Sequence, residues 1–296
     1  MKRTNKILYI VAVGILATVF LYCAASLTTY FLDSFKNQNT YNDLAELLEQ
    51  NRPTIPAATT PPTTMPPVVS TEPSGTGTPP QQTTAPTEPT SPYVTVTDPE
   101  TGEPVEMLPE FAALYELNND LVGWIRLDDT TLNYPVVQRP EKTDYYLRRD
   151  FYRKSATHGC IYVREQCDVF APSDNITIYG HRMRDGSMFA ALANYEKKSY
   201  WEDHQYIHFD TLKERHTYQI ISVFKTTATM GEGFRYHLFV DADGKKDFVT
   251  FMGNCEKLEL YSTGLTAGLG DKLITLSTCE YTLENGRLVV VARRID

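Results

Sequence analysis

The chain has 296 residues and carries 28 Lys and Arg against 37 Asp and Glu, a net charge of −9 at pH 7. Proteins that bind nucleic acids neutralise phosphates with clustered Lys and Arg, so this balance argues against a nucleic-acid partner. The length allows one or two domains. The composition changes sharply along the chain, so its segments are considered in order.

The first segment is apolar. No charged residue occurs from Ile7 to Leu32, a run of 26 residues, and a helix of about 20 apolar residues spans a bilayer. Lys2, Arg3 and Lys6 precede the run, and the positive-inside rule places such a flank in the cytoplasm. We therefore predict a cytoplasmic tail over residues 1–6, a transmembrane signal-anchor over 7–32, and an extracellular remainder of the chain.

A cleaved signal peptide is the alternative, because Ala24 to Ser26 supplies small residues. The apolar run exceeds the usual 7–15 residues of a signal peptide, which favours an uncleaved anchor. Cys23 follows the bulky Tyr22 and is not expected to be a lipoprotein site.

Residues 33–107 are predicted to form a juxtamembrane segment and a stalk. Asn42 to Gln50 has the pattern of a short helix. Between Arg52 and Pro104 lie 14 of the 18 prolines, interleaved with threonines. Such a composition favours extended polyproline II, and about 40 residues reach roughly 120 Å. The stalk is expected to hold a domain away from the membrane.

Residues 108–296 are predicted to form one mainly β domain. An initial helix is expected over Pro109 to Asn119, followed by eight short strands rich in β-branched and aromatic residues. The expected strands are 122–127, 131–137, 159–164, 175–179, 206–210, 218–224, 272–278 and 288–293. Further helices are expected over 187–195, 199–203 and 241–255, the last within a long connection from Thr226 to Asp271. Eight such strands suggest a closed or nearly closed barrel.

Three residues stand where a barrel rim would present them. Cys279 ends an apolar strand, His181 follows another strand, and Arg287 comes eight residues after Cys279 and precedes the last strand. A thiol attacks an amide as a thiolate, which a nearby imidazole promotes. An Arg, always charged, can stabilise an oxyanion. Taken singly, the three also fit a buried cysteine, a surface histidine and a solvated arginine.

The ordered motifs resemble the sortase family. They are TLSTC (275–279) followed by Arg287, Tyr179-Gly180-His181, LYELNNDLVGWIRLDDTTLNYPVVQ (114–138), DYYLRRD (144–150) and Gly159 to Val163. The resemblance extends over Leu108 to Asp296 and is greatest to class B sortases. It implies an eight-stranded sortase barrel with an N-terminal helix and a helix between the sixth and seventh barrel strands.

The resemblance also implies an activity. Cys279, His181 and Arg287 correspond to the catalytic set of a cysteine transpeptidase that uses no cofactor or metal. It would cleave an Asn-Pro-Gln-Thr-Asn-like sorting motif of an exported surface protein after Thr, through a thioester. A peptidoglycan precursor amine would then receive the protein. Ser277, Thr278 and Glu280 are expected to contact substrate, with the Glu280 N–H as a second oxyanion donor.

Other functions remain open at this point. A pilin-polymerising sortase would use a pilin lysine as acceptor; against the pilin-type class C, Glu100 rather than an aromatic follows Asp98-Pro99, and no C-terminal helix follows the last strand. A papain-like peptidase places its Cys before its His, unlike this chain. A stalked, non-enzymatic adhesion or binding module fits the anchor and stalk equally well.

The remaining cysteines and histidines receive structural interpretations. Cys160, Cys167 and Cys255 fit no metal or redox spacing and are expected to be buried free thiols, although a Cys160–Cys167 disulfide is possible. His204 and His208 are four residues apart at the entry to a strand, so they are not expected to bind zinc. His158, His216 and His237 are expected at the surface.

Overall fold

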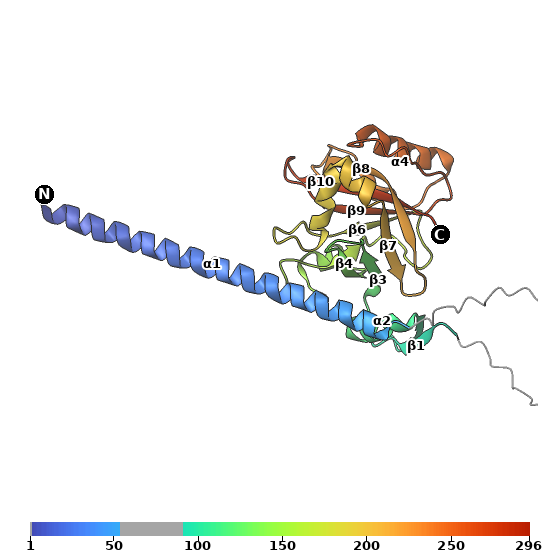
Figure 1. Cartoon of the computed structure of the whole chain (residues 1–296), viewed down its shortest axis with the longest axis horizontal. Coiled ribbons are helices and arrows are strands. Elements are labelled where there is room, and N and C mark those ends of the chain that lie inside the picture. The colour runs from blue at the N-terminus through green and yellow to red at the C-terminus, as the bar shows by residue number, and fades with distance from the viewer. Residues whose placement is uncertain (1, 54–90) are drawn as a thin grey trace, which may run out of the picture.

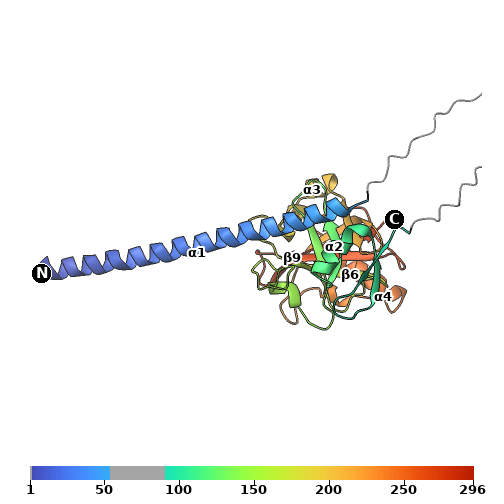
Figure 2. The same cartoon turned by 90° about the horizontal axis from the view of Figure 1, so that it is seen from below.

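A computed structural model describes residues 2–53 and 91–296 of the chain (Figure 1). A long N-terminal helix, α1, leads to a β-barrel domain, with smaller elements packed around the barrel (Figures 1 and 2). The Pro- and Thr-rich stretch that was predicted to be a stalk lies, from residue 54 to 90, outside the described residues.

The domain is a closed eight-stranded barrel in the order β10-β8-β7-β3-β4-β5-β6-β9. Its strands are β3 (Leu121–Arg126), β4 (Asn133–Val137), β5 (Ile161–Val163), β6 (Asn175–Tyr179), β7 (Tyr206–Thr211), β8 (Thr217–Thr227), β9 (Leu273–Cys279) and β10 (Gly286–Arg294). The predicted fold class and all eight predicted strands are confirmed. Closure pairs both edges of every strand, and alternate Ile, Leu and Val side chains of these strands fill the interior.

Helices cover the outside of the barrel. Four lie close to where they were predicted: α2 (Pro109–Leu117), η2 (Phe189–Glu196), α3 (Lys198–Asp203) and α4 (Lys245–Leu258). The short helices η1 (Tyr145–Arg148) and η3 (Tyr236–Leu238) were not predicted. Helix α4 lies in the long connection and packs on β8 (Figure 1). Its Phe251 stacks on Phe239, its Phe248 meets the same ring edge to face, and the three belong to a second apolar cluster outside the barrel.

A short hairpin was not predicted. Strands β1 (Val94–Thr97) and β2 (Pro104–Met107) pair antiparallel beside α2, in a stretch assigned to the stalk. Asp98 makes the turn by accepting the N–H groups of Glu100 and Thr101 at 2.8 and 2.9 Å, and its other oxygen accepts the Tyr115 hydroxyl. The domain therefore begins before residue 108.

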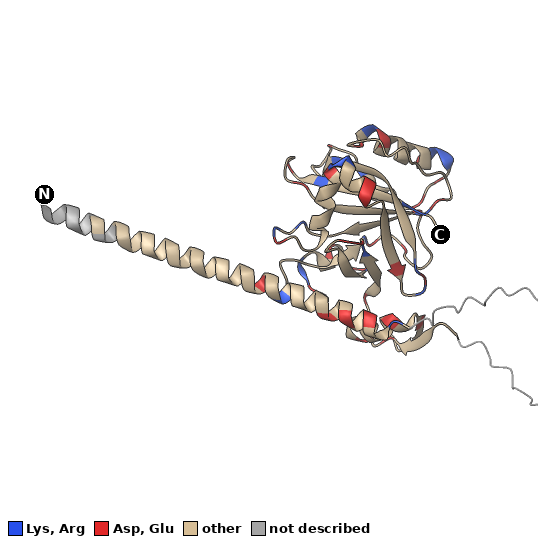
Figure 3. Ribbon diagram, in the orientation of Figure 1, with Lys and Arg blue, Asp and Glu red and all other residues tan. Residues whose placement is uncertain are grey.

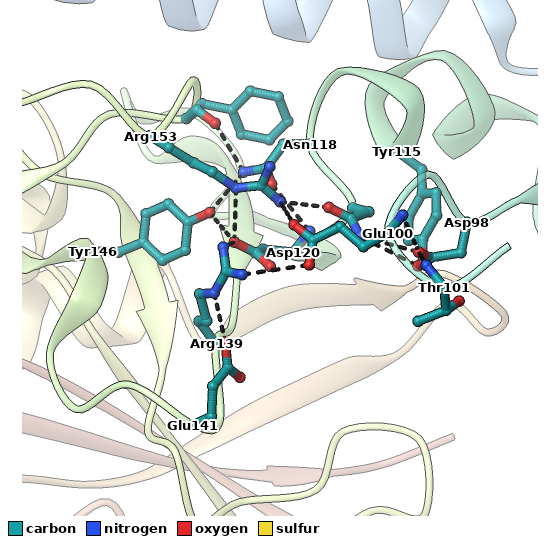
Figure 4. Close-up of polar contacts among 12 residues, drawn as sticks. Asp98, Glu100, Thr101, Tyr115, Asn118, Asp120, Arg139, Glu141, Tyr146 and Arg153 are labelled. Atoms are coloured by element: carbon teal, nitrogen blue, oxygen red, sulfur yellow. Dashed lines mark hydrogen bonds and ion pairs between the residues drawn. The ribbon is translucent and has the colours of Figure 1, made fainter.

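A polar cluster attaches this hairpin to the barrel (Figure 4). The Asp120 carboxylate accepts hydrogen bonds from Arg153 at 3.0 Å, from Arg139 at 3.3 Å and from the Tyr146 hydroxyl at 2.5 Å. Both arginines also pair with Glu100 of the hairpin turn. Because Tyr146 belongs to η1, the cluster fixes the hairpin and η1 to the same start of β3.

Helix α1 (Lys2–Asn51) is continuous, so the short helix predicted over 42–50 is the end of a much longer one. Tyr41, Leu44 and Leu48 are 1–2% exposed. The end of α1 that carries them packs against α2 and β4 (Figures 1 and 2). The chain thus reaches the barrel domain before the Pro- and Thr-rich stretch begins. The end of α1 thus contacts the barrel domain directly, and the stalk predicted for the stretch after it stays a prediction.

The earlier part of α1 differs from its docked end. Among the described residues, α1 is the one helix long and apolar enough to cross a membrane, by length and composition. Side chains such as Leu16, Phe20, Leu27 and Phe31 are 58–72% exposed. Figure 3 shows charged residues on α1 only from Asp33 onward, over the part whose side chains are described. A helix apolar on all sides suits a lipid environment.

Leu44→Ala tests the docking of α1. Removing a fully buried leucine is expected to lower the free energy of unfolding by about 2–5 kcal/mol, because it leaves a cavity between α1 and the domain. The measurement is chemical denaturation of the full chain in detergent. Phe35→Ala, at a position on α1 that is 67% exposed, is the control and should change stability little. Equal stability of the two variants would contradict the docking.

Candidate active site

Three neighbouring strands bring the candidate residues together. Strand β9 lies between β6, to which it is parallel, and β10, to which it is antiparallel. In this register Cys279, the last residue of β9, faces Arg287 of β10. On the other side, Tyr179 is paired with Ser277, so the chain leaves β6 toward His181 beside the same strand end.

The link between β6 and His181 is tightly held. Gly180 donates its N–H to the Ser277 carbonyl at 3.2 Å, and its own carbonyl accepts the Thr278 hydroxyl at 2.8 Å. A Cβ at Gly180 would lie 2.5 Å from Ile161 and 2.7 Å from the Phe189 ring. Glycine is therefore required here by close packing, and it fixes where His181 begins.

Cys279, His181 and Arg287 line one pocket of about 240 Å³. The other lining residues come from β5, β6, β9, η1 and the long connection: Asp144, Leu147, Tyr162, Tyr179, Gly180, Ala228, Tyr236, His237, Ser277 and Thr278. The predicted trio thus shares one cavity with a mixed polar and aromatic wall.

The His181 ring is oriented by η1. Its Nε2 donates to the Leu147 carbonyl at 2.8 Å; since a carbonyl only accepts, Nε2 carries the proton and Nδ1 holds the lone pair of the neutral ring. Burial lowers the pKa of His181, the Leu147 carbonyl opposes this, and the nearby charges of Arg148 and His158 lower it further. The neutral imidazole, able to accept a proton, is favoured.

Arg287 is held by its own loop. Its Nη1 donates to the carbonyls of Asn285 at 3.2 Å and Gly286 at 2.9 Å. Among the described residues, Nε and Nη2 make no hydrogen bond, so they remain free to bind an anionic oxygen at the pocket wall.

The three residues predicted to contact substrate lie differently. Ser277 lines the pocket, but it is 2% exposed and its hydroxyl is 2.6 Å from that of Tyr236. Thr278 also lines the pocket and uses its hydroxyl on Gly180. Both residues therefore line the pocket, while their hydroxyl groups make hydrogen bonds within the protein.

The prediction for Glu280 needs correction. Its backbone N–H donates to the Gly286 carbonyl at 2.9 Å, so it is not free to bind an oxyanion. Its buried carboxylate accepts the N–H groups of Thr282 and Leu283 and pairs with Lys225 at 3.1 Å. Burial opposes ionisation, but the hydrogen bonds from Thr282 and the Lys225 charge lower the pKa of Glu280 to about 2. It organises the loop between β9 and β10.

The sequence did not single out several residues of the pocket wall. Leu147 acts through its backbone carbonyl, which no side-chain pattern reveals. Tyr236 comes from the long connection, 41 residues before its partner Ser277. A long connection from Thr226 to Asp271 was predicted, but none of its residues was assigned to the site.

Other cysteines and histidines lie apart from the trio. Cys160, Cys167 and Cys255 are buried, unpaired thiols. Over residues 2–53 and 91–296, no group of three or more potential metal ligands gathers. His158 was expected at the surface, but it is 3% exposed because it bonds to Asp185 beneath α1.

Comparison with known families decides the identity. The sortase domain family model matches residues 125–295. The chain belongs to the sortase family. Sortase B of Staphylococcus aureus (strain NCTC 8325 / PS 47) is 33% identical over 189 residues, covering 63% of this sortase and 75% of that protein. Sortase B of Listeria monocytogenes is 30% identical, covering 64% and 76%.

Solved structures similar to this chain are also sortases of class B. Sortase B of Bacillus anthracis in complex with AAEK1 has a TM-score of 0.64 at 26% identity, covering 90% of this sortase and 99% of that chain. A Staphylococcus aureus sortase B–substrate complex has a TM-score of 0.59 at 33% identity, covering 64% and 86%. This sortase is therefore of class B and a transpeptidase, which excludes the non-enzymatic binding module and the papain-like peptidase.

Proposed function

We propose that this class B sortase uses Cys279, His181 and Arg287 to cleave an Asn-Pro-Gln-Thr-Asn-like sorting motif after Thr and to pass the acyl group to a peptidoglycan amine. The observation that carries the proposal is the strand register, which gathers the three side chains at one strand end around one pocket. A nucleophile, a base and a fixed cation are the groups that acyl transfer needs.

In the first step the Cys279 thiol passes its proton to the lone pair of His181, and the thiolate attacks the Thr carbonyl. The depressed pKa of His181 keeps the ring neutral, and the bond to Leu147 keeps the proton on Nε2, so Nδ1 is the accepting nitrogen. The resulting imidazolium returns its proton to the leaving amine, and a thioester remains on Cys279.

Arg287 supports the charge that develops in this step. The carbonyl oxygen becomes an oxyanion in the tetrahedral intermediate, and a guanidinium held against its own loop stabilises it without reorganising. The acceptor amine then attacks the thioester through a second tetrahedral intermediate. His181 takes the proton of the amine, and Cys279 leaves as the thiolate.

The proposal also assigns a location. Residues 7–32 of α1 would cross the membrane, with residues 1–6 in the cytoplasm and the barrel outside. The exposed apolar side chains of α1 and the charged residues that begin at Asp33 support this placement. The exported sorting-motif protein and the cell-wall amine would then both lie on the side of the barrel.

A transpeptidation assay tests the activity. Full chain in detergent is given a panel of fluorogenic sorting peptides, with and without triglycine as amine. We expect cleavage between Thr and the next residue, stimulated by the amine and abolished in Cys279→Ala, because the thioester cannot form. Cys23→Ala, an exposed cysteine of α1, is the matched control and should retain turnover. Cleavage by Cys279→Ala, or no cleavage of any motif, would refute the proposal.

Arg287→Lys tests the oxyanion role. A point charge does not reproduce the planar fork, so we expect kcat to fall about 100-fold, the loss typical of one oxyanion donor, with KM little changed. Arg294→Lys on the same strand is the control for the substitution itself. Steady-state kinetics of both variants decide the matter, and near-normal turnover by Arg287→Lys would remove this residue from the mechanism.

Arg148→Ala tests the base. Removing a positive charge near His181 makes its imidazolium less unfavourable, so the pKa of His181 rises. Because the neutral ring is needed, the acid-side limb of the kcat/KM–pH profile should move to higher pH. Arg148→Lys keeps the charge and should leave the limb in place. A limb that stays put in Arg148→Ala, or moves to lower pH, would contradict the assignment.

A further inference from the structure

His181 sits at the start of a short loop that we call the histidine loop, residues 180–188, between β6 and η2. The two ends of the loop are bonded to each other. The Phe189 N–H donates to the His181 carbonyl at 2.9 Å, and Arg182 and Met188 form an isolated antiparallel β-bridge. Its position relative to the barrel therefore depends on what holds its far end. Two residues at that end, Asp185 and Met188, have partners outside the loop.

Asp185 is the more connected of the two. One carboxylate oxygen accepts the N–H and hydroxyl of Ser187 at 3.0 and 2.6 Å, which shapes the loop itself. The other accepts His158 Nε2 at 3.0 Å and the hydroxyl of Ser34, a residue of α1. Burial opposes ionisation of Asp185, but hydrogen bonds from Ser187, Ser34 and His158 hold its pKa well below the usual value.

Met188 provides a second connection to α1. It is fully buried at a φ of 58°, an unfavourable backbone for a non-glycine residue, and its N–H donates to the Tyr134 hydroxyl at 2.9 Å. The Tyr134 ring meets that of Tyr41 edge to face at 5.1 Å between centroids, and the Tyr41 hydroxyl donates to the Gly159 carbonyl at 2.9 Å. Tyr41, like Ser34, belongs to α1.

We infer that α1 is part of the scaffold of the active site: Ser34 and Tyr41 hold the far end of the histidine loop, and Asp185 is a positioning residue for His181. This inference rests on the catalytic role of His181 proposed above. It gives α1 a part in transpeptidation beyond holding the enzyme at a membrane.

The physical reason lies in how few bonds orient His181 itself. Among the described residues its ring makes one hydrogen bond, to the Leu147 carbonyl, so the position of the ring depends strongly on the backbone of the histidine loop. Proton transfer requires the ring within hydrogen-bonding reach of its partner, and a misplacement of about 1 Å can cost on the order of 100-fold in rate. Substrate binding along the pocket wall does not need this restraint, so kcat should suffer and KM should not.

The test compares point variants of the full chain in phospholipid nanodiscs, using the fluorogenic transpeptidation assay. Ser34→Ala removes one bond to Asp185, and we expect kcat about 3- to 10-fold lower with KM unchanged within roughly twofold. Ser34→Thr keeps a hydroxyl and should restore kcat. Asp185→Asn, which disturbs the bonds to both Ser34 and His158, should lower kcat about 10- to 100-fold.

Matched controls separate this effect from general damage. Ser26→Ala removes a hydroxyl from α1 away from the barrel, and Asp129→Asn removes a carboxylate from an exposed turn; both should keep wild-type kcat. Thermal unfolding identifies a variant that fails to fold. If Asp185→Asn unfolds, the Ser34→Ala and Ser34→Thr pair alone decides, because a lost surface hydroxyl leaves the fold intact.

The outcomes distinguish this inference from the proposal on which it rests. Wild-type kcat in Ser34→Ala, a change confined to KM, or no rescue by Ser34→Thr overturns the role of α1. If His181→Ala is inactive at the same time, the catalytic role of His181 survives that failure. Full activity of His181→Ala would instead overturn the proposed mechanism, and the positioning role with it.

Discussion

The pairing of β9 with β6 on one side and β10 on the other is the constraint on which the site depends. A strand in the middle of a sheet has its register fixed twice, and here one register sets Cys279 opposite Arg287 while the other starts the histidine loop beside it. A slip of β9 by one residue in either pairing would turn the Cys279 side chain to the opposite face of the sheet. Closure of the barrel removes the free edge along which such a slip begins.

Around this centre, the supporting contacts come from segments distant in sequence. Tyr146 ties η1 to the Asp120 cluster, and the next residue, Leu147, presents its carbonyl to His181. On the opposite side Asp185 ties the histidine loop to His158 and α1. The His181 imidazole is thus held between two polar clusters, one linked to the β1–β2 hairpin and one to the N-terminal helix.

Much of the fold could be predicted from the sequence, because the barrel strands alternate or are continuously apolar and because their motifs follow in the order of a known family. Cys279 and His181 could be found because Cys279 ends a strongly patterned strand, His181 follows another, and the motifs around them resemble those of that family. Strand β1 was missed since Val94–Thr97 is short and sits in a Pro- and Thr-rich context.

What could not be predicted depended on tertiary contacts. His158 looks like a surface residue in its sequence, but α1 and Asp185 bury it. The Glu280 N–H was expected to be free, but in the folded protein it donates to the carbonyl of Gly286, the first residue of β10. The place of α1 beside β4 was invisible because its buried residues, Tyr41, Leu44 and Leu48, lie on one side of a helix that is otherwise exposed.

The continuity of α1 has a consequence for where the reaction takes place. A helix rises about 1.5 Å per residue, so Ser34 lies only roughly 3 Å along the axis beyond Leu32, the last residue of the apolar run. In the membrane placement proposed above, the histidine loop would sit at the lipid boundary. Encounters with a substrate tethered to the same surface would then be two-dimensional, and their frequency would depend on lateral density and effective concentration more than on affinity in solution.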